Sequence, residues 1–174
     1  MKTNIFRPIK IGKETFHPKF FDESSFIMDW TMQEGGAVPQ HLHKHMDELF
    51  TVTEGEVLFT VNGQKMIKKT GEVLFVPRGT PHSIKNETKE KIGLTVKYSP
   101  CADTHRMFEI IATLDQENPG SMINMLKYFY LVPKLKLREF STLEPKFIMN
   151  VINTVIKIMG LLLGWKRLVG KFKN

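Results

Sequence analysis

The sequence of 174 residues contains a single cysteine, Cys101, which excludes an internal disulfide framework. Its first residues contain no apolar run of signal-peptide length, so we expect a cytoplasmic protein. Internal repeats and low-complexity segments are also missing. With 41% hydrophobic and 25% charged residues, the composition is that of an ordinary globular chain, long enough for one full domain and an extension.

Acidic residues are scarce in the last part of the chain. Residues 1–126 carry 15 lysines and arginines against 16 acidic residues, whereas residues 127–174 carry 10 against 2. The net charge of +7 therefore comes from residues 127–174, and an anionic partner can be argued only for them. No known nucleic-acid-binding motif accompanies this charge, so we expect no nucleic-acid partner.

The first hundred residues show the pattern of a β-rich domain. Short apolar segments alternate with turn residues, and Asn62-Gly63 is the strongest hairpin signal, because a type I′ turn needs positive φ at both central residues. Many short strands at regular spacing indicate a mainly β sandwich or barrel. We predict strands over residues 25–32, 49–53, 56–61, 64–68, 72–76, 82–85 and 92–98, and we expect residues 72–76 to be buried.

After residue 100 the apolar spacing becomes helical. A first helix is expected to begin near Thr104, and a second near Met122, with Pro133 ending it. A third is expected over residues 146–166, behind a capping box at residues 141–144. We therefore divide the chain into a β-barrel domain, residues 1–100, and a helical extension, residues 101–174.

The third predicted helix is nearly free of charge. Residues 147–165 contain one charged residue over almost the length of a bilayer span. Its polar residues and glycines fall on one narrow face, which predicts an amphipathic helix with a broad apolar face: Asn150, Asn153, Lys157, Gly160 and Gly164. We favour packing on the barrel or in a homodimer. Peripheral membrane contact, supported by Trp165 and the basic residues after it, is one alternative, and a helix that spans the membrane is the other.

A cluster of histidines marks the candidate site. His41 and His43 lie two apart and can therefore project from one face of a strand. Glu48 has the opposite parity, so we expect a bend or bulge between them. His82 follows a Pro-Arg-Gly-Thr-Pro turn. Imidazole and carboxylate together suit a first-row transition metal.

Other residues near the cluster are given structural roles. We expect His45 at a rim or in solvent, Arg78 at an exposed corner and Asn86 in a turn. His17 and His105 have no constellation of ligands around them. Six strand residues are predicted to be core, and some of them could line an apolar pocket suited to an apolar or aromatic substrate: Met28, Trp30, Phe50, Phe59, Phe75 and Val96.

Two segments resemble the paired sequence motifs of the cupin superfamily. The first reads Gly35-x5-His41-x-His43-x4-Glu48-x6-Gly55, and the second reads Gly71-x5-Pro77-x-Gly79-x2-His82-x3-Asn86. The resemblance covers about residues 35–98. It implies a double-stranded β-helix, or jelly-roll barrel, that binds a divalent metal (Fe, Mn, Ni, Zn or Cu) at its mouth through His41, His43, Glu48 and His82.

The resemblance further implies a metal-dependent enzyme that acts on a small organic molecule. Dioxygenase, isomerase or hydrolase chemistry would fit, and Glu48 could leave the metal to act as a catalytic base. The alternative is a non-catalytic module that binds or senses a small molecule, because this barrel hosts many functions. In that case the basic helical extension would serve dimerisation or peripheral membrane contact.

Overall fold

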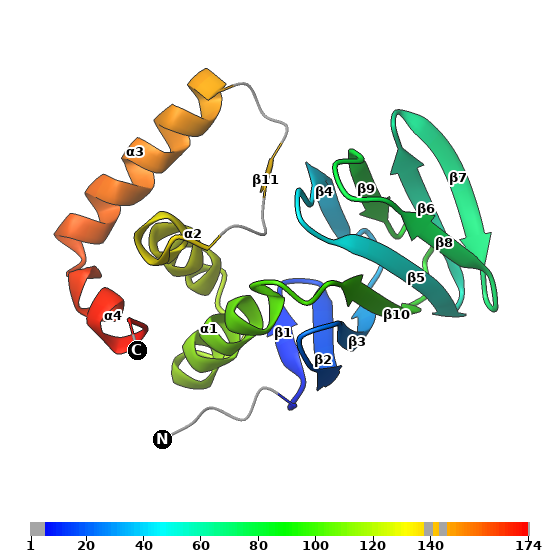
Figure 1. Ribbon diagram of the computed structural model, residues 1–174, viewed down its shortest axis with the longest axis horizontal. Coiled ribbons are helices and arrows are strands. Elements are labelled where there is room, and N and C mark those ends of the chain that lie inside the picture. The colour runs from blue at the N-terminus through cyan, green and yellow to red at the C-terminus, as the bar shows by residue number, and fades with distance from the viewer. Residues whose placement is uncertain (1–5, 138–140, 143–145, 174) are drawn as a thin grey trace.

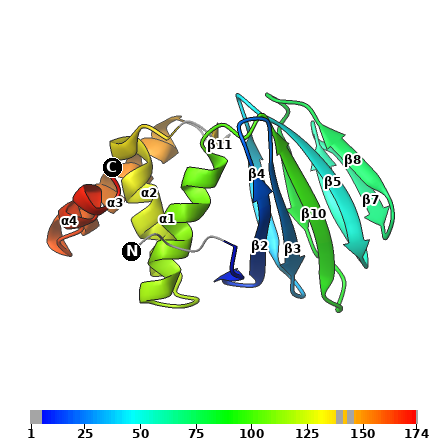
Figure 2. The ribbon, with the colours of Figure 1, turned by 60° about the horizontal axis from the view of Figure 1, so that its bottom comes forward.

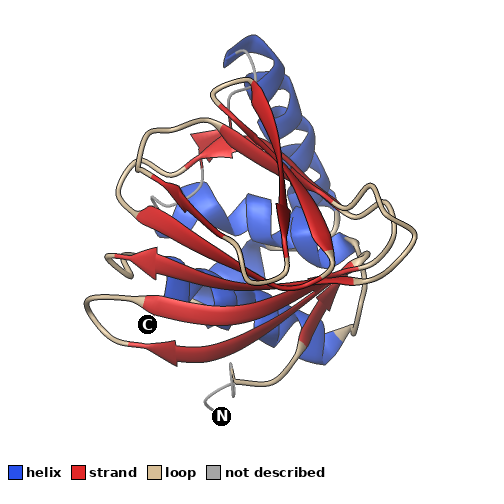
Figure 3. Ribbon diagram, turned by 90° about the vertical axis from the view of Figure 1, so that its right-hand side faces the viewer, coloured by secondary structure: helices blue, strands red, loops and turns tan. Residues whose placement is uncertain are grey.

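The computed structural model describes residues 6–137, 141–142 and 146–173. Two antiparallel sheets form a barrel at one end of the molecule, and the helices are stacked in layers at the other end (Figures 1 and 2). Figure 3 shows the strands in front and the helices behind them. The chain is thus mainly β, with a helical region at its C-terminal side, as predicted.

Eleven strands are present in the described ranges. The six-stranded sheet has the order β1 (Ile9–Ile11), β2 (Glu14–Phe21), β3 (Phe26–Met32), β10 (Ile92–Ser99), β5 (Asp47–Glu54) and β8 (Val73–Val76). The five-stranded sheet has the order β11 (Ser141–Thr142), β4 (Ala37–Leu42), β9 (His82–Lys85), β6 (Glu56–Val61) and β7 (Gln64–Lys69).

The predicted hairpin between β6 and β7 is confirmed. Asn62 and Gly63 have φ values of 49° and 79°, the positive pair that a type I′ turn requires. Val61 pairs with Gln64 directly across this turn. The two-residue turn therefore sets the register of the β6–β7 pair.

The barrel is filled from the inner faces of both sheets. In β3 every second residue is buried, so that Phe26, Met28, Trp30 and Met32 all point inward. The prediction that residues 72–76 are buried is wrong, because β8 is the edge strand of its sheet. Phe75 is 56% exposed and does not line the interior. The other five predicted core residues are buried.

Four helices follow the strands: α1 (Thr104–Glu117), α2 (Ile123–Leu135), α3 (Lys146–Leu162) and α4 (Lys166–Lys171). The prediction that Pro133 ends the second helix is wrong. A proline in the last turn removes a single backbone donor, and α2 continues to Leu135. It ends at Lys136, whose φ is 56° and whose N–H bonds to the Val132 carbonyl.

The third helix ends four residues before the predicted position. Gly164 adopts a φ of 68°, and the Trp165 N–H donates to the Gly160 carbonyl at 2.8 Å, which closes the end of α3 before α4 begins. Part of the predicted capping box, residues 143–144, lies outside the described residues. Its first two residues form the short strand β11.

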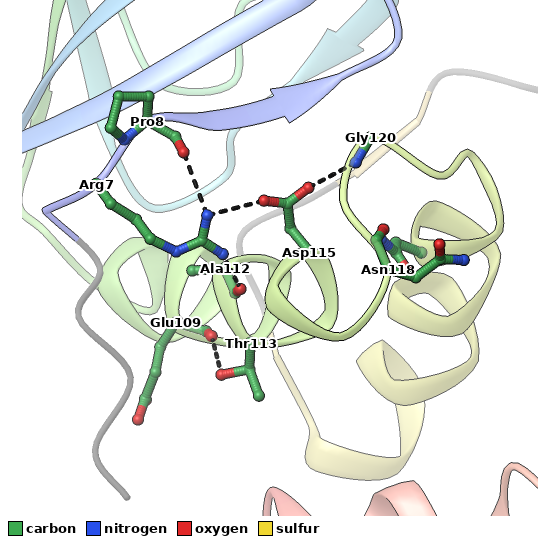
Figure 4. A network of polar contacts seen from close by, with 9 residues as sticks. Arg7, Pro8, Glu109, Ala112, Thr113, Asp115, Asn118 and Gly120 are labelled. Carbon is green, nitrogen blue, oxygen red and sulfur yellow. Dashed lines mark hydrogen bonds and ion pairs between the residues drawn. The ribbon is translucent and has the colours of Figure 1, made fainter.

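The extension is tied to the N-terminal part of the barrel (Figure 4). Arg7 donates to Asp115 at 2.9 Å and to the Ala112 carbonyl at 2.5 Å, and the second Asp115 oxygen accepts from the Gly120 N–H. Phe108 of α1 stacks on Phe26 of β3 with ring centroids 5.0 Å apart. The barrel and the first two helices therefore share one hydrophobic core. Their treatment as two domains stays a prediction.

Helix α3 packs against α2 and not against the barrel, which corrects one of the expected placements (Figures 1 and 2). Ile156 is buried in this contact. Gly160, predicted on the outward polar face, instead meets the Tyr130 ring of α2, where an added Cβ would lie 2.3 Å from Cε2. None of the helices in the described ranges combines the length and apolar character needed to cross a membrane.

Candidate metal centre

The four predicted ligands arrive from both sheets. His41 lies on β4 directly opposite His82, the first residue of β9. His43 follows the end of β4, and the chain then crosses to β5, which carries Glu48. The bend expected from residue parity is therefore present, as the connection between the two sheets.

The structure brings the four side chains together in the barrel. One ligand atom from each lies within 4.8 Å of the others. Nε2 of His43 is 3.5 Å from Oε1 of Glu48, and Nε2 of His82 is 2.7 Å from Oε2 of Glu48. None of the four residues is more than 7% exposed. Their geometry is that of a preformed, solvent-shielded site.

Two of the histidines are oriented by backbone carbonyls. Nδ1 of His41 lies 2.9 Å from the Pro39 carbonyl oxygen, and Nδ1 of His82 lies 3.0 Å from that of Thr80. A carbonyl oxygen can only accept, so each Nδ1 carries the hydrogen and donates it. In the neutral ring this leaves the Nε2 lone pair directed at the cluster, the arrangement typical of metal-binding histidine.

The contact between His82 and Glu48 tests whether this cluster fits a cation. Nε2 of His82 and Oε2 of Glu48 are buried and lie 2.7 Å apart, but they lack the alignment of a hydrogen bond and have no other partner. A buried polar atom without a partner costs about 1–3 kcal/mol. A cation bound by both atoms would remove that cost. Three imidazoles and one carboxylate are thus compatible with a divalent metal.

The pKa shifts of His41 and Glu48 suit the same purpose. Burial, and then the neighbouring His82 and His43, lower the pKa of His41 to about 4, which keeps its ring neutral. Burial acts to raise the pKa of Glu48, but its contacts with His82 and His43 outweigh this effect and hold the pKa below its usual value. His82 differs: burial lowers the pKa of its imidazole, but the Glu48 carboxylate outweighs burial and raises the pKa, so a bound metal would have to displace that proton.

Tyr98 belongs to the site and was not identified from the sequence. It pairs with Glu48 across β10 and β5, and its ring meets that of His43 edge-on with centroids 5.8 Å apart. Burial, together with the charge of Glu48 and a hydrogen bond to it, raises the pKa of Tyr98 far above its usual value. The neutral phenol therefore supports the carboxylate. Only the strand register, which the sequence does not give, places the two residues together.

A short segment of the extension also reaches this region. In β11, Thr142 pairs with His41 and Ser141 pairs with Leu42. The segment thus adds a strand to the edge of β4, beside one of the predicted ligands. The interpretation of residues 141–144 as a capping box did not predict this pairing.

The predictions for His45, Arg78 and Asn86 are confirmed. His45 is exposed and lies outside the cluster, as do His17 and His105. Arg78 is exposed and forms a two-pronged pair with Asp47 at 3.0 and 2.8 Å. Asn86 is a buried turn residue, whose side-chain amide donates to the carbonyls of Met32 and Glu90.

The fold and the buried cluster define a jelly-roll barrel with a candidate metal centre. Residues 28–96 match the sequence family described as Cupin domain. An uncharacterized protein of Methanocaldococcus jannaschii is 26% identical over 87 residues, which cover 49% of this chain and 70% of that protein. Quercetin 2,3-dioxygenase of Bacillus subtilis is 33% identical over 55 residues, which cover 32% of this chain but only 16% of that enzyme.

Solved structures agree with this assignment. The cupin domain of Cnp3 from Schizosaccharomyces pombe superposes with a TM-score of 0.51 at 27% identity, covering 57% of this chain and 74% of that one. An RmlC-like cupin from Shewanella frigidimarina has a TM-score of 0.53 at 19% identity, covering 60% and 99%. Residues 28–96, which form most of the barrel, are thus a cupin domain within this chain.

Proposed function

We propose that the chain is a metal-dependent enzyme, of dioxygenase or isomerase type, that acts on a small organic molecule. The observation that carries the proposal is the buried cluster of His41, His43, Glu48 and His82, whose ligand atoms lie within 4.8 Å of one another. A bound divalent metal would supply Lewis acidity or, with a redox-active ion, the capacity to activate dioxygen. The similarity of part of the barrel to quercetin 2,3-dioxygenase supports the oxygen-dependent form.

In this proposal each residue of the metal site has a defined role. The three histidines and Glu48 would hold the ion, and the carbonyls of Pro39 and Thr80 would orient two of the rings. Tyr98 would keep the Glu48 carboxylate in place. The lowered pKa of Glu48 suits a ligand that stays ionised, and its service as a base stays a prediction.

The surroundings of the cluster favour an apolar or aromatic substrate. The Phe50 ring lies 6.3 Å from the His82 ring and 5.3 Å from that of Phe59, and both phenylalanines are fully buried. These two rings place apolar surface beside the ligands, which supports an apolar or aromatic substrate. Flavonols are therefore a reasonable first class of compound to test.

The experiment is oxygen consumption by the full chain reconstituted with iron, manganese, nickel or copper, with quercetin as the first substrate and product analysis by mass spectrometry. We expect turnover that is lost in His82→Ala and kept in His45→Ala, the matched change of an exposed histidine in the same region. Substrate screens that include isomerisation assays cover the second reaction type. A ligand that binds equally well to His82→Ala, with no turnover in the wild type, would favour a non-catalytic binding module.

A further inference from the structure

Helix α3 and Leu163, the residue that follows it, carry an exposed apolar surface, here called the α3 face. Fifteen large hydrophobic side chains in the described part of the chain are strongly exposed, and seven of them lie between residues 151 and 163. These seven are 42–81% exposed: Val151, Ile152, Val155, Ile158, Leu161, Leu162 and Leu163. A concentration of this kind marks a contact surface, since single exposed hydrophobic residues are normally scattered.

The α3 face is broad. At 100° per residue, the exposed apolar residues span roughly 200° of the helix circumference. The opposite side, with Ile156 and Gly160, packs on α2. Figures 1 and 2 show α3 as the outermost layer, with α2 between it and the barrel. The pairing of two helices needs only a narrow seam of two positions per heptad, so this width favours a flat apolar partner.

The charged residues within α3, α4 and the segment that joins them are all of one sign. Residues 146–173 contain six basic residues and no acidic residue. Lys157, in the middle of α3, and Lys166 and Arg167, just beyond its end, are all exposed. A second copy of the chain on this face would bring these positive charges against their own counterparts. An anionic lipid surface complements them and also takes up the apolar side chains.

We propose that the α3 face lies on an anionic membrane surface, with the helix resting along its side. The apolar side chains of the α3 face would enter the boundary between headgroups and acyl chains, and Lys166 and Arg167 would meet the headgroups. Trp165 takes no part in this contact. It is 4% exposed and packs edge-on against Tyr130, so it fixes the end of α3 to α2.

The test is co-sedimentation of the full chain with vesicles of phosphatidylcholine mixed with phosphatidylserine, and with vesicles of phosphatidylcholine alone. We expect binding to the anionic vesicles that weakens at high ionic strength. The double variant Lys166→Gln/Arg167→Gln should lower the affinity roughly 30-fold, at about 1 kcal/mol for each basic residue near the surface. Val155→Gln/Leu162→Gln should lower it at least roughly tenfold.

Matched controls lie on the barrel. Lys65→Gln/Lys89→Gln removes two exposed charges, and Ile67→Gln removes an exposed apolar side chain of β7, so both should leave vesicle binding unchanged. Equal binding to both kinds of vesicle, or binding that the α3 variants do not weaken, would overturn the proposal. So would a wild-type dimer that ignores vesicles and becomes monomeric with Val155→Gln/Leu162→Gln, since a second copy would then cover the α3 face.

Discussion

Replacing Gly160 with alanine tests the packing of α3 on α2. A Cβ at this position would lie 2.3 Å from Cε2 and 2.5 Å from Cδ2 of Tyr130. The ring cannot move away freely, because Tyr130 is buried and is in contact with both the Trp165 ring and the Lys134 ammonium. The two helices must therefore separate if the methyl group is to fit.

Two effects of opposite sign determine the magnitude. Alanine is a better helix former than glycine by about 1 kcal/mol, which favours the variant. Overpacking of a close contact costs about 1–3 kcal/mol, and a separation of 2.3 Å belongs in the upper part of that range. We expect Gly160→Ala to lower the free energy of unfolding by about 1–2 kcal/mol.

The assay is urea unfolding followed by tryptophan fluorescence, since Trp165 reports directly on the α2–α3 contact. Gly170→Ala is the matched control. Gly170 lies in α4 with no atom within 4 Å of the added Cβ, so this change should stabilise the chain by about 0.4–1 kcal/mol. If Gly160→Ala were as neutral or stabilising as Gly170→Ala, the close approach of the two helices would be refuted.

Three further changes have defined outcomes. Burial raises the pKa of Glu14 from 4.5 to about 7, so the folded state binds the extra proton and the free energy of unfolding should fall as pH rises from about 5 to 7. Allowing for partial solvent screening, this fall in the free energy of unfolding is about 1–2 kcal/mol. It should be absent in Glu14→Gln and present in the exposed control Glu23→Gln. Urea titrations at a series of pH values measure it. Asn86→Ala should cost about 2–3 kcal/mol in the same assay, because buried carbonyls lose their donors; an unchanged midpoint would contradict the hydrogen bonding described. Arg78→Ala should leave the urea midpoint unchanged, because the ion pair of Arg78 with Asp47 is exposed. A large fall in the midpoint would show that this ion pair stabilises the fold.

Most strands of the barrel could be predicted from local sequence patterns. Short apolar segments and turn residues located the strands, and Asn62-Gly63 fixed a hairpin. The four clustered side chains were identified from residue type and spacing, together with the resemblance to the two cupin motifs. These features depend on residues close in sequence, which is why they could be predicted.

The errors concern features that only the three-dimensional arrangement decides. The exposure of Phe75 depends on β8 lying at a sheet edge. The place of Tyr98 beside Glu48 depends on strand register. The pairing of Thr142 with His41 joins segments a hundred residues apart. The inward orientation of Gly160 depends on a neighbouring helix, because a glycine carries no polarity that would mark the exposed side.

The metal content of the purified full chain tests the central claim most directly. We predict close to one divalent transition metal ion per chain by elemental analysis. The double variant His41→Ala/His43→Ala should lose it, and His45→Ala should retain it, because His45 is exposed and lies outside the cluster. A wild-type chain that takes up no metal after incubation with iron, manganese, nickel, copper or zinc, or a double variant that binds metal as well as the wild type, would contradict the account.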